Sequence, residues 1–167
     1  MNFLAHFHLA WPDADLIAGG LEGDYFKGPL RGELPLGIER GIKLHRAIDA
    51  YTDRHILVQQ LRREFPLNLR RYAGILIDLS FDHYLSLHWS RFCDTPLTDF
   101  NEAVHRKLAE YEMSLSNDAR VMLTRLQEYD VLNLYVSWET VPATAKRIGE
   151  RFKRHNPFVA VDHQLSP

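Results

Sequence analysis

The chain of 167 residues has the length of one domain with one core, and its 46% hydrophobic and 25% charged residues are typical of a globular protein. Its net charge of -2 gives no electrostatic argument for binding nucleic acid, and no apolar run approaches the length that spans a membrane. The single Cys93 excludes an internal disulfide, and the N-terminus lacks the basic start of a signal peptide. We therefore expect a cytoplasmic protein that binds neither nucleic acid nor membranes.

Periodic apolar residues predict helices through the first half of the chain. The first two are expected over 2–10 and 13–26. Gly19, Gly20 and Gly23 weaken the second helix, although glycines in a helix often let another backbone approach closely. A loop rich in Gly and Pro should follow, and further helices are expected over 36–56, 57–65 and 73–89. Asn68 is expected to cap the helix at 73–89, with Arg70 and Arg71 on its first turn.

The second half of the chain shows the same helical spacing. We expect helices over 97–115, 117–129 and 141–154, the last capped by Thr140, and a short element within 130–139. No segment alternates as a strand does, so the predicted fold class is all-α. The predicted organisation is a single-domain helical bundle over residues 1–155, followed by a loose tail over 156–167.

The segment 73–89 is apolar at most positions, as a buried central helix is, yet it carries Asp78, Asp82 and His83. A buried carboxylate is costly unless it is paired, hydrogen-bonded or bound to a metal. Asp78 and Asp82 are four residues apart and should stack on one helical face, and His83 could share their pocket from its edge. This pattern predicts a bound cation.

A second set of polar residues lies on the apolar side of the helix at 36–56. His45 and Asp49 are one turn apart, and Asp53 follows one turn later. Asp24 comes after the glycine-rich helix. Imidazole and carboxylate ligands from two helices suit Mn, Fe or Zn, and sets rich in carboxylates favour Mn or Mg. The alternative is that these residues form ion pairs with arginines inside the bundle, for which Arg46, Arg70 and Arg71 are available.

Two further features have ordinary explanations. His6 and His8 would not share a helical face, and a histidine near an apolar segment is more often packed or hydrogen-bonded than a ligand. The basic residues at 62–63, 70–71 and 146–154 would ordinarily form a solvated face, and less often a surface that docks an acidic partner.

Four motifs together resemble the bacterial acyl carrier protein phosphodiesterase family: MNFLAHFHLA, GDYFKG, GIKLHRAIDAYTDRH and IDLSFDHYLSLHWS. They cover residues 1 to about 92. The resemblance implies a helical fold like that of the HD-type metal-dependent phosphohydrolases. It also implies hydrolysis of the phosphodiester that joins 4'-phosphopantetheine to a serine of holo acyl carrier protein, with Mn²⁺ as the metal.

The resemblance further implies roles for individual residues. The implied metal ligands are Asp24, His45, Asp82, His83 and Asp78. The implied catalytic groups are Asp82, His83 and Asp49. His6 belongs to the opening motif as a possible site residue, with its role open. The implied docking residues for the acidic carrier protein are Arg70, Arg71, Lys146 and Arg147.

The chain departs from the family pattern in two ways. Its paired residues read Asp-His where the standard HD pattern reads His-Asp, and we expect it to end short of the family's usual C-terminal helix. Two alternatives stay open beside the carrier-protein hydrolase. The first is an HD-like hydrolase of a nucleotide or small phosphoester, and the second is a non-catalytic module that binds carrier protein.

Overall fold

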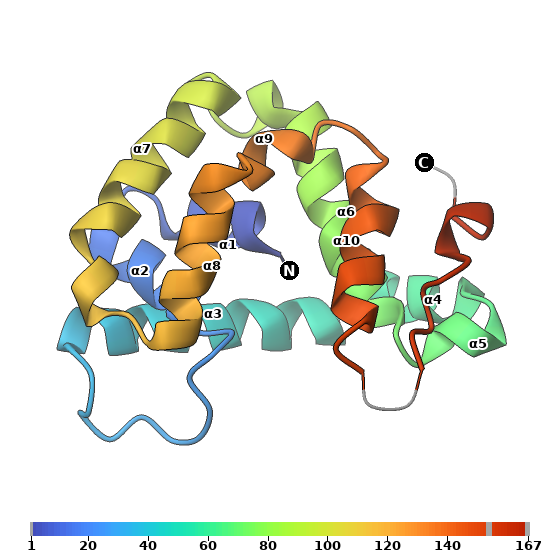
Figure 1. Ribbon diagram of the computed structural model, residues 1–167, viewed down its shortest axis with the longest axis horizontal. Helices are drawn as coiled ribbons and strands as arrows, with labels where there is room; N and C mark the ends of the chain where they lie inside the picture. Colours follow the sequence, from blue (N-terminus) through green and yellow to red (C-terminus); the bar gives the residue numbers. More distant parts are fainter. Residues whose placement is uncertain (1, 153–154, 166–167) are drawn as a thin grey trace.

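The protein is described by a computed structural model over residues 2–152 and 155–165, and this part of the chain is helical and contains no strand (Figure 1). The predicted all-α class is therefore confirmed. The α-helices are α1 (Phe3–Ala10), α2 (Ala14–Glu22), α3 (Leu36–Arg54), α4 (Ile56–Glu64), α5 (Leu67–Arg70), α6 (Ala73–Leu87), α7 (Leu97–Glu110), α8 (Asn117–Glu128), α9 (Val131–Leu134) and α10 (Thr140–Gly149). Three short 3₁₀ helices complete the set: η1 (Trp89–Arg91), η2 (Glu112–Ser114) and η3 (Val161–His163).

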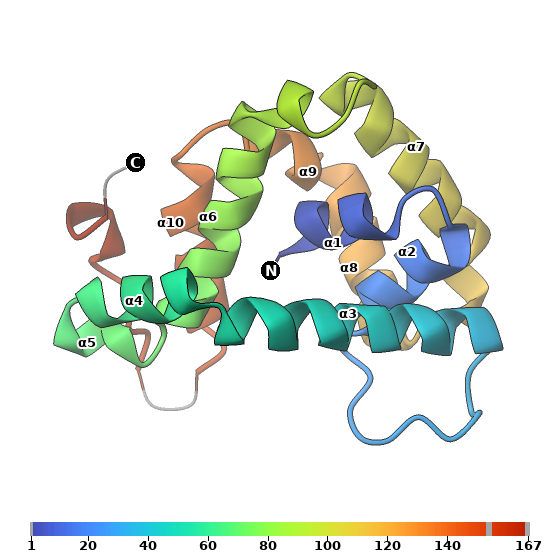
Figure 2. The ribbon, with the colours of Figure 1, turned by 180° about the vertical axis from the view of Figure 1, so that it is seen from behind.

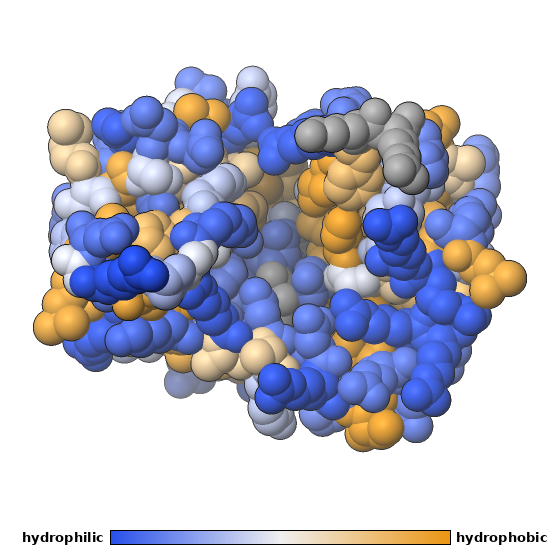
Figure 3. Space-filling view, turned by 90° about the horizontal axis from the view of Figure 1, so that it is seen from below, coloured by the Kyte–Doolittle hydropathy of each residue, from blue (hydrophilic) through white to orange (hydrophobic). Residues whose placement is uncertain are grey.

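The long helix α3 runs along one side of the molecule and connects its two ends (Figures 1 and 2). Helices α1, α2, α7 and α8 gather at one end, while α6 and α10 pair at the other, close to α4 and α5. Seen from below, the surface is hollowed near its middle, with mostly hydrophilic side chains around the hollow and hydrophobic ones on part of its wall (Figure 3). Within the first end, α1 faces the second end, because it packs against α6 as well as against α2 and α3.

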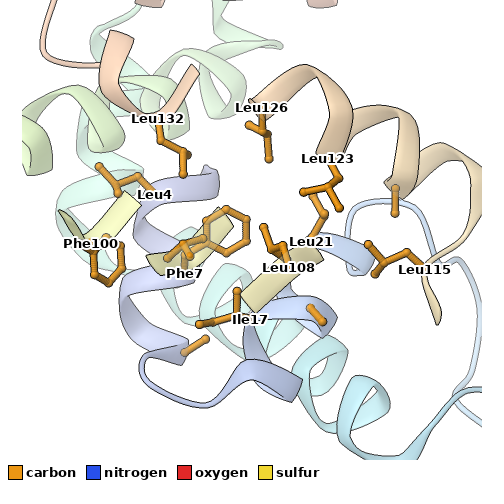
Figure 4. Close-up of a cluster of buried hydrophobic side chains, with 14 of the residues drawn as sticks. Leu4, Phe7, Ile17, Leu21, Phe100, Leu108, Leu115, Leu123, Leu126 and Leu132 are labelled. Atoms are coloured by element: carbon orange, nitrogen blue, oxygen red, sulfur yellow. The ribbon is translucent and has the colours of Figure 1, made fainter. Parts of the chain in front are cut away.

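The larger core cluster fills the end formed by α1, α2, α3, α7 and α8. Its side chains come from helices whose apolar residues recur at spacings of three and four, so that one face of each turns inward. Burial of this apolar surface is the main favourable contribution to folding. Figure 4 shows the convergence of these side chains, including Leu4, Phe7, Ile17, Leu21, Phe100, Leu108, Leu123, Leu126 and Leu132.

Two glycines let α2 and α3 pack closely. A Cβ atom on Gly19 would lie 2.3 Å from the carbonyl oxygen of Ile38 and 2.5 Å from the Cα of Gly41. A Cβ atom on Gly41 would in turn lie 2.7 Å from the Cα of Gly19. The glycines that weaken α2 as an isolated helix therefore allow it to lie directly on the backbone of α3, as the sequence suggested.

The predicted loose tail is wrong for part of its length. A second core cluster joins α5, α6 and α10, and the side chains of Phe158 and Val161 are fully buried in it. Residues after α10 therefore close this end of the molecule, with η3 as a short turn of helix. The predicted helix at 141–154 ends at Gly149, and residues 153, 154, 166 and 167 lie outside the described part.

The start of the central helix also differs from the prediction. Asn68 lies inside α5, Arg70 ends that helix, and α6 begins at Ala73, with Tyr72 at its N-cap position. Nor is α6 buried on all sides, because Tyr84 and Leu87 are 42% and 49% exposed. The helix has a buried stripe and an exposed one, as most helices in globular proteins do.

Gly19→Ala should destabilise the protein, by about 1–3 kcal/mol, because its new methyl group meets backbone atoms of α3 that have no room to move. Gly20→Ala is the matched control, since the nearest atom to its Cβ would be Cδ1 of Phe7 at 4.0 Å. Urea denaturation of both variants measures the difference. Equal stabilities for the two variants would contradict the close packing of α2 on α3.

Candidate metal centre and adjoining pocket

Two histidines and one carboxylate meet where α1 crosses α3. The Nε2 atom of His6 lies 3.1 Å from Oδ1 of Asp49, and Nε2 of His45 lies 3.2 Å from Oδ2 of the same carboxylate. The two imidazole rings stack, with centroids 4.0 Å apart and an angle of 14° between the planes. One potential ligand atom from each residue falls within 4.8 Å of the other two. We call this set the His6–His45–Asp49 group.

The local structure explains why these three side chains meet. His45 and Asp49 are one turn apart on α3 and therefore point to the same side of the helix. His6 is buried on α1, among residues that pack into the core, and it reaches α3 from the other side. His8 lies away from it and packs by its ring edge against Trp89, as the spacing on α1 predicted.

Asp24 lies at the edge of the same group, directly after α2. Its Oδ1 atom is 3.7 Å from Nε2 of His45, and its side chain is 47% exposed. Gly23 provides the space for this approach, because a Cβ atom there would lie 2.5 Å from Cγ of His45. The predicted neighbours Asp24, His45 and Asp49 are therefore brought together, and they are joined by His6.

The charged carboxylate form of Asp49 is strongly favoured over the protonated form. Burial alone would raise its pKa, but the hydrogen bonds with His45 and His6 outweigh burial and bring the pKa well below its usual range. For His6, burial is the larger effect and lowers the pKa despite the neighbouring Asp49 carboxylate. A carboxylate anion facing a neutral imidazole is the protonation state in which both residues can bind a metal.

The geometry fits a divalent transition metal. Two ligands bound at about 2.0–2.2 Å and roughly at right angles to each other lie about 3 Å apart. The observed distances of 3.1 and 3.2 Å between the histidine nitrogens and the Asp49 oxygens have this size. Two nitrogens with one or two carboxylate oxygens are a donor set for Mn, Fe or Zn rather than for Ca²⁺.

A polar pocket of about 280 Å³ adjoins the group and shares Asp49 with it. The pocket lies between the end of α3, the helix α4 and the first turn of α6. It is lined by Asp49, Asp53, Arg62, Arg71, Tyr72, Gly74, Ile75 and Asp78. Burial raises the pKa of Asp78 above its usual range. Asp78 therefore faces the same cavity as Asp49, although it is not part of the His6–His45–Asp49 group.

Asp82 has different partners from Asp78, although the two are one turn apart. Its side chain is fully buried, and its oxygens accept hydrogen bonds from the backbone amides of Leu4 (2.8 Å) and Ala5 (3.0 Å). These amides belong to the first turn of α1, which has no partners within the helix for them. Burial raises the pKa of Asp82 to about 7, against the opposing effect of the two amides. The carboxylate thus anchors α1 to α6.

His83 also bonds to the backbone. Its Nδ1 atom lies 2.8 Å from the carbonyl oxygen of Tyr135 and donates to it, and its ring meets the ring of Trp138 edge-on. Among the described residues, the potential metal ligands that converge are His6, His45 and Asp49, so neither Asp82 nor His83 is brought into this group. Their predicted roles as ligands and catalytic groups stay predictions.

Comparison with known proteins identifies the family. The model of the acyl carrier protein phosphodiesterase family matches residues 1–166 of the chain. The chain belongs to this family. Acyl carrier protein phosphodiesterases from Photorhabdus laumondii, Klebsiella pneumoniae and Escherichia coli are 41%, 39% and 41% identical to it over 95, 109 and 101 residues. No solved structure matches the chain.

The relatives are matched over part of their length. The aligned segments cover 57%, 65% and 60% of this chain, and 48%, 56% and 52% of the three phosphodiesterases. The chain therefore spans about half the length of the curated relatives that it matches. In the described part of this family member, no helix is both long and apolar enough to cross a membrane.

The four predicted docking residues have different surroundings. Arg70 donates from Nη2 to the carbonyl oxygens of Arg63 and Phe65, and Lys146 is paired with Asp162. Arg71 lines the pocket, and Arg147 is exposed on α10. The alternative explanation of the acidic residues was that they pair with arginines. Arg46, one of the arginines available for such a pair, donates instead to the carbonyl oxygen of Phe26.

Sequence reasoning did not assign a site role to Arg62, which also lines the pocket. The only signal was its position in a basic pair at the end of the helix that follows Asp53. For His6 the signal was its place in the opening family motif, which left its role open. Neither signal specifies a contact. His6 lies on α1 and Arg62 on α4, and the spacing of residues along the chain does not predict which helices pack against α3.

Asp49→Asn should weaken Mn²⁺ binding by about 100-fold or more, because it keeps the shape of the side chain and removes the anion that both histidines face. Asp53→Asn, one turn later on α3, is the matched control and should bind the metal nearly as the wild type does. Isothermal titration calorimetry with MnCl₂ measures both affinities. Equal losses in the two variants would contradict the proposed centre.

The burial of Asp82 should make the unfolding free energy of the protein depend on pH. Its pKa in the folded state lies above the unfolded value, so the stability linked to its protonated form is present below about pH 4 and is lost as the pH rises through about 7. When the pH rises from 5 to 7.5, the unfolding free energy of the wild type should therefore fall by more than about 1 kcal/mol relative to that of Asp82→Asn. Urea denaturation at the two pH values measures it, and a pH-independent difference would contradict it.

Proposed function

We propose that the protein hydrolyses the phosphodiester between 4'-phosphopantetheine and the serine of holo acyl carrier protein, with Mn²⁺ as its metal. The family supports the reaction, since its curated relatives are named acyl carrier protein phosphodiesterase. The observation that carries the proposal is the convergence of His6, His45 and Asp49 at the wall of a polar pocket. A metal-binding group beside a solvent-accessible cavity is what metal-assisted hydrolysis requires.

In this proposal His6, His45 and Asp49 hold the metal, and Asp24 offers a further carboxylate oxygen at the same edge. The bound metal would lower the pKa of a water molecule and polarise a phosphoryl oxygen. The two histidines are buried and stacked, so their positions are fixed by packing. Asp49 is 40% exposed and opens the group toward the pocket. Asp82 acts through α1, whose position it fixes.

Proton transfer is assigned to two carboxyl groups on either side of Asp49. Asp24 is partly exposed and would accept the proton of the attacking water. Asp78 lines the pocket, and because burial raises its pKa, it retains a proton more readily than an exposed aspartate. It is therefore suited to protonate the departing serine oxygen. The base role needs the anion of Asp24. Burial raises the pKa of Asp24 as well, but the adjacent His45 and His6 oppose that rise and so favour the anion.

The carrier protein would dock on the surface around the pocket. Arg71 and Arg147 are exposed, whereas the side chains of Arg70 and Lys146 are engaged by carbonyl groups and by Asp162 within the chain. Basic side chains at the rim of an interface speed association with an acidic partner. We also propose a cytoplasmic location, because the one cysteine, Cys93, is a free thiol, as is usual for proteins of a reducing compartment.

The alternative of a small phosphoester as substrate is not favoured by the pocket. Asp53 and Arg71 are exposed at its rim, so the cavity opens onto the surface, where a serine of another protein could approach. A closed cavity would favour a nucleotide or small phosphoester instead. Hydrolysis of bis-p-nitrophenyl phosphate without any effect on holo carrier protein would support that alternative.

The decisive measurement is the intact mass of holo acyl carrier protein after incubation with this protein. With Mn²⁺ present, the carrier should lose the mass of 4'-phosphopantetheine, and chelation of the metal or the Asp49→Asn substitution should prevent the loss. Asp99→Asn, an exposed residue of α7 that does not line the pocket, should leave the loss of mass unchanged and so shows that the effect of Asp49→Asn is specific. An unchanged carrier mass with the metal-loaded wild-type protein would overturn the proposal, and so would loss of mass in the presence of chelator.

A further inference from the structure

We propose that Arg62 and Arg71 form an anion-binding subsite that receives the phosphoryl oxygens of the substrate beside the His6–His45–Asp49 group. The inference rests on the proposed function for the identity of the substrate, but the binding of the anion can be tested without turnover. Both arginines line the pocket that Asp49 shares with the metal-binding group. Among the described residues that line the pocket, these two carry a positive charge.

Arg62 is held in place by two contacts. Its Nη2 atom lies 3.3 Å from Oδ1 of Asp53, the residue one turn beyond Asp49 on α3. The same Nη2 atom lies against the start of α6, where a Cβ atom on Gly74 would be only 2.5 Å away. The side chain is still 38% exposed, so its other donors remain available to a ligand. A guanidinium fixed at one edge and open at the other is suited to bind phosphate.

Arg71 approaches the pocket from the link between α5 and α6. Its guanidinium carbon lies 5.9 Å from the centroid of the neighbouring Tyr72 ring, which also lines the pocket. The adjacent Arg70 differs, because it donates to two backbone carbonyl groups at the end of α4. The basic pair at 70–71 therefore divides into one arginine that stabilises the chain and one that faces the cavity.

The charges of the pocket make anion binding depend on the metal. Three carboxyl groups, those of Asp49, Asp53 and Asp78, line the cavity together with the two arginines. Without a metal these carboxyl groups oppose the entry of an anion. A divalent cation at Asp49 would reverse the balance at the inner wall, so that a phosphoryl group would be bound by the metal on one side and by the arginines on the other. The start of α6 adds a smaller effect of the same sign.

Calorimetric titration with inorganic phosphate tests the subsite in the protein loaded with Mn²⁺. The wild type should bind phosphate with Mn²⁺ bound and much more weakly after chelation. Arg62→Gln and Arg71→Gln should each weaken phosphate binding by about tenfold or more, since each removes a charge-assisted hydrogen bond. Both variants should keep the Mn²⁺ affinity of the wild type. Arg63→Gln is the matched control, because Arg63 is the exposed neighbour on α4 and does not line the pocket.

Gly74→Ala tests the geometry without removing a charge. Its methyl group would displace Nη2 of Arg62, the flexible end of a side chain, so the fold should be retained while phosphate affinity falls. Phosphate affinities of Arg62→Gln and Arg71→Gln equal to that of the wild type would overturn the subsite. An equal loss in Arg63→Gln would also overturn it, because the effect would then be one of overall charge.

Turnover of holo carrier protein separates this inference from the proposed function. If the carrier is hydrolysed, Arg62→Gln and Arg71→Gln should lower kcat/KM, and wild-type values in both would refute the subsite alone. If the carrier is not hydrolysed but phosphate binding requires the metal, Arg62 and Arg71, the subsite is supported and the proposed substrate is wrong.

Discussion

The buried carboxylate of Asp82 is the interaction on which the arrangement of the site depends. It accepts hydrogen bonds from the first amides of α1, which would otherwise lose their water without gaining a partner. The bond joins α1 to α6, and α1 in turn carries His6 to the stacked position against His45. An acidic residue that resembles a ligand in the sequence thus fixes the helix that carries His6 into the His6–His45–Asp49 group. Leu4 and Phe7 complete the attachment by packing into the larger core cluster.

Position on a single helix was the part of the site that the sequence could predict. The spacing of His45 and Asp49 on the apolar side of α3 is a local property, and the structure places them together. Asp78 and Asp82 were predicted to share one pocket because they are also one turn apart. They diverge because Asp78 lines the cavity beside Asp49, whereas Asp82 finds its partners in backbone amides, which leave no signature in a sequence.

Contacts between different helices could not be predicted from the sequence, because residue spacing describes only one helix at a time. Arg62 reaches the cavity because the extended backbone of His55 separates α4 from α3 and α4 packs against α6. Nothing in the spacing of residues specifies that packing. Phe158 and Val161 follow no helical period, yet they fill the second core cluster. Composition and periodicity therefore gave the all-α class and most helices, while the cavity and the packing of the C-terminal segment required the tertiary structure.

The His6–His45–Asp49 group draws its residues from α1 and from α3, which are separated in the chain by α2 and a long loop. An ion bound there would be a cross-link between two distant points of the backbone. Because the site exists only in the folded protein, an ion that binds there raises the free energy of unfolding by an amount that grows with the metal concentration. The protein would then have a removable cross-link in place of a disulfide. Loading with metal would stabilise the packing of α1 on α3, and chelation would weaken it.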